Sequence, residues 1–139
     1  MPIPMELQHA SDDFERFLAA ARDGSGLATR NQTYTMVEGV LRTFRRRLAV
    51  QQALDFADVL PPLLRAIFVS RWDISEPVLR FADRATLTRE VQALRQHHNF
   101  APDNCLVEVA RALRPHVDAE TFDRVLATLP DGAADYWRV

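Results

Sequence analysis

The sequence predicts an all-α fold: a single compact helical bundle of about eight helices, built from two tandem four-helix repeats with pseudo-twofold symmetry. Three observations lead to this prediction. Apolar residues recur at intervals of three and four, the spacing that places them on one face of a helix. Only four glycines occur in 139 residues, and no segment alternates apolar and polar residues for long, so hairpins are not expected. The chain also matches itself when it is shifted by 69 positions.

The apolar stripes define the helices in order. The clearest stripe steps by three and four residues through Tyr34, Val37, Leu41, Phe44 and Leu48. Ser11 and Asp118 each precede a stripe and are predicted N-caps, because their short side chains accept hydrogen bonds from the free N–H groups of a first turn. The expected helices span 11–22, 30–47, 51–60, 61–70, 85–98, 103–115, 118–128 and 130–137.

The internal repeat sets the expected domain organisation. Two stretches align without a gap, 36–70 and 105–139. The apolar stripe and a Leu-Pro pair recur together in this alignment, which indicates a repeated structural unit. Neither half carries enough apolar surface to be stable alone, so we expect the halves to pack face to face. The predicted organisation is one domain over 1–139, with repeat 1 at about 11–70, a linker at 71–84 and repeat 2 at about 85–139.

The charge of the chain indicates which classes of partner are disfavoured, and its cysteine content indicates the cellular compartment. All 17 basic residues are arginine, and 19 acidic residues leave a net charge of -2, which favours neither nucleic acid nor a membrane as partner. The single cysteine cannot form an intramolecular disulfide, which is typical of a reducing compartment. No apolar run approaches the roughly 20 residues of a membrane span, and the first residues do not resemble a secretory leader. We therefore expect a cytoplasmic protein.

Arginine and tryptophan supply the candidate ligand-binding residues. Arg42 and Arg45 recur under the 69-residue shift, and a tryptophan follows the last helix of each repeat. Guanidinium groups and indoles lining a cleft between the repeats would suit a small anion such as a phosphate or a carboxylate. A solvated, ion-paired arginine face and indoles that close the core are the alternatives. The candidate residues are Arg42, Arg45, Arg111, Arg114, Trp72 and Trp137.

The remaining reactive side chains favour structural roles. His97 and His98 are adjacent, so on a helix they point about 100° apart, whereas helical metal sites use pairs four residues apart. Cys105 lies in the first turn of a predicted helix, but the shift aligns it with an apolar position, which indicates a buried thiol. We predict no catalytic residue, no metal site and no cofactor.

One segment carries a family resemblance. Residues 58–73, with the sequence DVLPPLLRAIFVSRWD, resemble the signature of the bacterial domain-of-unknown-function family 2267, and the resemblance extends over roughly 11–139. It implies an all-helical cytoplasmic protein and no known activity, cofactor or catalytic residue. The second repeat departs from the pattern, because the sequence DGAA at 131–134 follows its Leu-Pro pair in place of an apolar run with arginine.

Several functions remain open after these observations. A non-enzymatic interaction or scaffold module is the leading interpretation, with a protein partner or a second copy in a homodimer as its target. The alternative is a module that binds a small anionic ligand in a cleft between the repeats. An enzyme would need a titratable pair in a cleft, for which His97, His98 and His116 are the candidates near neutral pH. Nucleic-acid binding through the arginine-rich second helix is disfavoured by the net charge.

Overall fold

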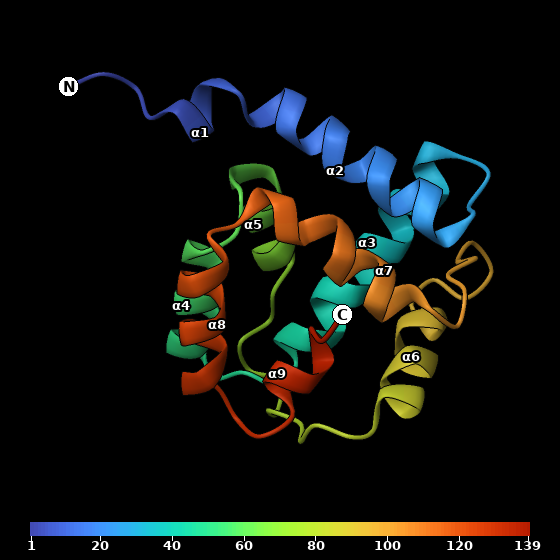
Figure 1. Cartoon of the computed structure of the whole chain (residues 1–139). Helices are drawn as coiled ribbons and strands as arrows, with labels where there is room; N and C mark the ends of the chain where they lie inside the picture. The colour runs from blue at the N-terminus through green and yellow to red at the C-terminus, as the bar shows by residue number, and fades with distance from the viewer.

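The computed structural model describes residues 1–139 and is entirely helical, without a strand (Figure 1). None of its helices combines the length and the apolar character that crossing a bilayer requires. The α-helices are α1 (Met5–Gln8), α2 (Ala10–Ser25), α3 (Arg30–Arg45), α4 (Val50–Asp58), α5 (Pro62–Val69), α6 (Arg84–Ala93), α7 (Cys105–Leu113), α8 (Ala119–Thr128) and α9 (Ala133–Tyr136), and a 3₁₀ turn, Arg114–His116, follows α7.

Side-chain caps fix the start of three helices. Thr29 forms a capping box with Gln32 at the start of α3, which satisfies two backbone N–H groups reciprocally. Asp83 and Asp118 accept hydrogen bonds from backbone N–H groups at the starts of α6 and α8, so the cap predicted at Asp118 is confirmed. The cap predicted at Ser11 is wrong, because α2 begins at Ala10 and Ser11 lies within it.

Helix α6 is the element that differs most from the prediction. It ends at Ala93, whereas the sequence pattern extended it to residue 98. The side-chain amide of Asn99 donates hydrogen bonds to the carbonyls of Val91 and Leu94, at 2.7 and 2.8 Å, and so takes the place of the next helical N–H groups. Arg95 then adopts a left-handed conformation, with φ of 53°, which turns the chain away from the helix axis.

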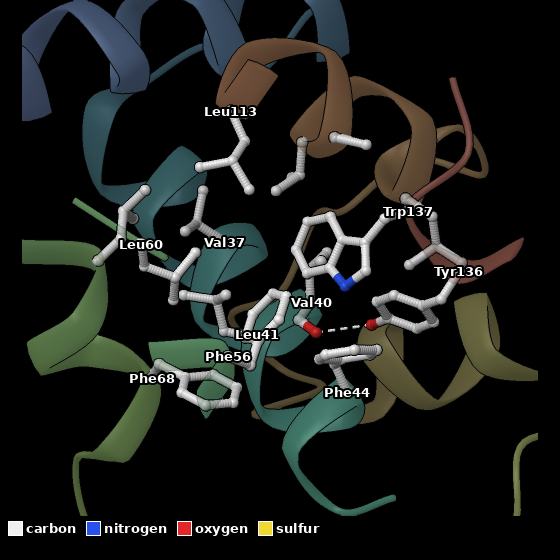
Figure 2. Close-up of a cluster of buried hydrophobic side chains, with 14 of the residues drawn as sticks. Val37, Val40, Leu41, Phe44, Phe56, Leu60, Phe68, Leu113, Tyr136 and Trp137 are labelled. Atoms are coloured by element: carbon white, nitrogen blue, oxygen red, sulfur yellow. Dashed lines mark hydrogen bonds between the residues drawn. The ribbon is translucent and has the colours of Figure 1, made fainter. Parts of the chain in front are cut away.

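The core is a single cluster that draws on the whole chain. It contains 30 buried apolar residues, from Phe17 to Trp137. Figure 2 shows Phe44 of α3 facing Phe56 of α4 and the rings of Tyr136 and Trp137 near the C-terminus. The Tyr136 hydroxyl donates a hydrogen bond of 2.6 Å to the carbonyl oxygen of Val40, which holds the end of the chain against α3. The interior between the two halves is therefore filled by aromatic side chains.

Helices of the N-terminal half pack against helices of the C-terminal half. Helix α2 packs against α7, α3 against α6, and α4 against α8. Close approach of α3 and α6 depends on Gly39, because a Cβ atom there would lie 3.0 Å from Val91 Cγ1 and 3.1 Å from the Val91 carbonyl oxygen. Each half thus covers apolar surface of the other, and the segment between α5 and α6 joins them at the lower edge of Figure 1.

Candidate functional site

Four arginines, Arg42, Arg45, Arg46 and Arg47, cluster at the C-terminal end of α3, and each has a different environment. Arg47 is only 5% exposed and donates two hydrogen bonds to the carboxylate of Glu90 on α6. It also donates to the carbonyl oxygens of Thr43 and Arg80. Arg47 therefore joins α3, the linker and α6, which is a structural role.

Glu90 remains a carboxylate because of this arrangement. Its partial burial raises its pKa, but the hydrogen bonds and charge of Arg47, with the charge of Arg46, outweigh burial, so the pKa lies below the ordinary value. Arg46 lies 3.6 Å from the same carboxylate, and its side chain is 40% exposed. Arg46 therefore shares Glu90 with Arg47, but its side chain stays partly exposed to solvent, whereas that of Arg47 is buried.

Arg45 is a buried cation without an acidic partner. It is 7% exposed, and its Nη1 donates hydrogen bonds of 2.9 Å to the carbonyl oxygens of Phe68 and Ser70, at the end of α5. Its Nε is buried and makes no hydrogen bond, and no carboxylate oxygen lies within 4.0 Å of the guanidinium. Burial and the nearby charge of Arg42 lower the pKa of Arg45. Its guanidinium carbon lies 5.5 Å from the ring centre of Trp72, in a cation–π contact.

Arg42 belongs to a row of three interacting polar side chains on α3, spaced four residues apart. Its guanidinium lies 3.8 Å from the carboxylate of Glu38, and the Tyr34 hydroxyl donates a hydrogen bond of 3.2 Å to that carboxylate. Burial and the charge of Glu38 raise the pKa of Tyr34. The Nε of Arg42 is buried without a partner, as is that of Arg45. Near this end of α3, four arginines face three carboxylates: Glu38, Glu76 and Glu90.

Arg45 and Arg46 lie at the edge of an apolar surface, which we call the linker face. Most of its residues come from the segment between α5 and α6, and Ile74 and Val78 are 67% and 58% exposed. A small cavity of 40 Å³ lies at its centre, with the buried Leu48 in its wall. The linker face comprises Arg45, Arg46, Val50, Trp72, Ile74, Glu76, Pro77 and Val78.

Arg111 and Arg114 lie elsewhere, around an open hollow of 680 Å³ that also includes Arg138. Each of the three guanidiniums has an acidic partner on its own half of the chain: Glu108, Asp123 and Asp135 respectively. Arg114 also stacks over Phe122, with its guanidinium carbon 4.8 Å from the ring centre. This hollow is richer in ion pairs than the linker face.

Trp137 is part of the core. It is fully buried, and its ring centre lies 5.5 Å from that of Phe44 and 5.6 Å from that of Phe56. Trp72, in contrast, is partly exposed at the linker face. The six candidate residues therefore do not line one cleft. Arg45 and Trp72 lie together, and Arg111 and Arg114 form a second group. Arg42 pairs with Glu38, and Trp137 is buried in the core.

The other reactive side chains lie apart from these surfaces. His97 and His98 are both exposed in the loop after α6. No group of three or more histidine, cysteine, aspartate and glutamate side chains is arranged to hold a metal ion. Cys105 is fully buried at the start of α7, as its alignment with an apolar position predicted. Burial raises the pKa of its thiol to about 11, because the backbone N–H groups of the helix start only partly oppose the desolvation.

Cys105 is therefore expected to resist alkylation in the folded protein. With the pKa raised from 9.0 to about 11, the thiolate fraction at pH 8 falls about a hundredfold, and burial also blocks the reagent. Iodoacetamide labelling followed by intact mass measurement should show no adduct in the native chain and complete reaction in denaturant. Equal rates in both conditions would show that the thiol is accessible.

Two features escaped the sequence reasoning. The sequence pattern predicts only a connection for residues 71–84, although this segment contains apolar residues, among them Ile74 and Val78, which the structure exposes. The N-terminal residues 1–8, which we call the N-terminal arm, carry exposed Ile3, Met5 and Leu7. The sequence signal for this arm is the alternation of these three apolar residues with residues of other types.

The fold and its surfaces define a small helical protein with one shared core and arginines at two separate surfaces. The chain matches the model of a family described as an uncharacterized conserved protein family, DUF2267, over residues 14–136. This match spans most of the 139 residues, so the chain belongs to that family, and the resemblance found in segment 58–73 is confirmed. The comparison with curated proteins gave no match.

Proposed function

We propose that this protein is a non-enzymatic interaction module that acts through the linker face. The observation that carries the proposal is the exposure of Ile74 and Val78 beside the guanidiniums of Arg45 and Arg46. Contiguous apolar surface costs free energy in water and is typical of a site that binds another protein surface. Arginine and tryptophan at such a surface are the residue types that contribute most to protein–protein binding.

The architecture supports this role. We infer that α2 to α5 and α6 to α9 are two copies of one four-helix unit, related by a pseudo-twofold axis. Two pairings support this inference, because α2 packs on α7 and α3 packs on α6, as a twofold exchange of the units requires. The linker is the element that the repeat leaves unduplicated, so it is free to carry a surface of its own. The single cysteine of the chain, the buried Cys105, suits the cytoplasmic location that the proposal includes.

Replacing Val78 with glutamate tests the proposal. Val78 is 58% exposed, so the substitution removes apolar contact from the linker face and leaves the core intact. We expect the Val78→Glu variant to keep its thermal stability and to lose association, measured by sedimentation velocity over a concentration series. Val139→Glu is the matched control, because Val139 is 55% exposed and lies outside the linker face. Association that is equal in both variants would contradict the proposal.

Binding of a small anionic ligand is the second candidate, and one observation favours it. The guanidiniums of Arg111, Arg114 and Arg138 surround one open hollow of 680 Å³. A phosphate or carboxylate could accept hydrogen bonds from more than one of them. Their three acidic partners compete with such a ligand, so we place this candidate second.

A further inference from the structure

The linker face contains one guanidinium, that of Arg45, that forms no ion pair within the chain, whereas Arg46 pairs with Glu90. The buried Arg45 has only carbonyl oxygens as hydrogen-bond acceptors, and its Nε has none. Glu76 lies in the same wall and acts on Arg45 at longer range, but it forms no ion pair with it. A buried cation without an anion is unfavourable, so this face is suited to an incoming acidic group.

The acidic group must arrive together with apolar side chains. Val50, Ile74 and Val78 surround the two arginines and are 43%, 67% and 58% exposed. A free inorganic anion would neutralise Arg45 and leave this apolar surface in water. A peptide segment with a carboxylate between two apolar residues would satisfy both requirements at once.

The N-terminal arm has this composition. Glu6 lies between Met5 and Leu7, which are 66% and 49% exposed, and Ile3 is 63% exposed. Helix α1 buries none of its residues, and a helix of one turn is not stable without packing. Within its own chain, Glu6 has only a long ion pair of 3.9 Å with Arg65, and the Glu6 side chain is 55% exposed, so this contact is weak.

The arm does not reach the linker face of its own chain. In Figure 1 it extends from the N-terminal end of α2 at the top, whereas the segment between α5 and α6 descends from α5 and then runs along the bottom to α6. The arm and this segment therefore lie apart in the molecule. Only an arm from another molecule can pair with this face, and a second copy supplies one.

We propose that the linker face binds the N-terminal arm of a second copy of this chain. Glu6 of the arm accepts hydrogen bonds from the partly exposed Arg46 and brings a negative charge close to Arg45, while Met5 and Leu7 cover the exposed apolar residues of the face. Each copy gives one arm and receives one, and exchange of both arms between the same two molecules makes a twofold-symmetric dimer. This inference rests on the proposed interaction function and names the partner.

A charge exchange tests the pairing. Glu6→Arg and Arg46→Glu should each weaken dimerisation of the full chain at least about tenfold in sedimentation velocity, because each places like charges together. The double variant, Glu6→Arg with Arg46→Glu, should return to within about threefold of the original dissociation constant. Circular dichroism checks the fold, and Arg46→Gln replaces Arg46→Glu if the latter unfolds, with a smaller loss expected.

The control is Glu120→Arg, which makes the same charge change at a side chain that is 86% exposed on α8. It should leave dimerisation unchanged. If Val78→Glu abolishes association and Glu6→Arg does not change it, another occupant binds the linker face: the arm proposal fails and the interaction function stands. If neither variant changes association, or if the chain stays monomeric at every concentration, both proposals fail.

Discussion

Replacing Phe44 with alanine is expected to lower the free energy of unfolding by about 3–5 kcal/mol. Phe44 is fully buried, and its ring centre lies 4.7 Å from that of Phe56 and 5.0 Å from that of Tyr136. The substitution removes apolar contact from three elements and leaves a cavity among rigid rings that cannot collapse to fill it. Urea denaturation, monitored by tryptophan fluorescence, measures the change.

Phe100→Ala is the control for this variant. Phe100 is 59% exposed in the loop before α7, so the same truncation there should change the free energy of unfolding by less than about 1 kcal/mol. A loss of less than about 1 kcal/mol for Phe44→Ala as well would mean that α3 does not turn this face into the core.

Arg47→Ala should lower the free energy of unfolding by about 3 kcal/mol, because it leaves the partly buried carboxylate of Glu90 without its main partner. It also removes the hydrogen bonds to the carbonyl oxygens of Thr43 in α3 and of Arg80 in the linker. The Arg47 side chain then no longer holds the linker against α3. Arg124→Ala breaks an ion pair whose side chains are 66% and 86% exposed, and should cost less than about 1 kcal/mol.

The pH dependence of stability adds a second readout for Arg47. The pKa of Glu90 is lower in the folded chain than its ordinary value, so the unfolded chain binds the proton more readily. The contribution of the pair is therefore fully present above the ordinary glutamate pKa and is lost as the pH falls through the folded pKa. The original chain should lose more stability in this acidic range than Arg47→Ala does. Parallel stability–pH curves for the two chains would contradict the assigned pair.

Local patterns in the sequence predicted most of the helices. The stripe from Tyr34 to Leu48 predicted α3 because its period is set within one helix, although the helix ends at Arg45, before Leu48. The start of α8 followed from Asp118 for the same reason, since a cap and its helix are adjacent in the chain. The end of α6 did not follow, because Asn99 reaches back to Val91 after a loop, and periodicity carries no information about such a contact.

The candidate site was predictable only in part, because its residues act through distant partners. Arg45 binds carbonyl oxygens 23 and 25 residues away, and Arg47 pairs with a carboxylate 43 residues away. The sequence therefore indicated where arginines cluster but not which one is neutralised. Trp137 illustrates the same limit, since its position after a short helix fits a surface as well as a core.

A native mass spectrum of the purified chain, followed by a denaturing one, tests most directly the claim that the protein is a self-associating module. The account predicts a dimer at twice the chain mass of 15.8 kDa, with no added mass, and a single chain mass after denaturation. A monomer of 15.8 kDa at concentrations up to the solubility limit would contradict it. A monomer carrying extra mass that disappears on denaturation would contradict it too, and would favour the ligand-binding candidate instead.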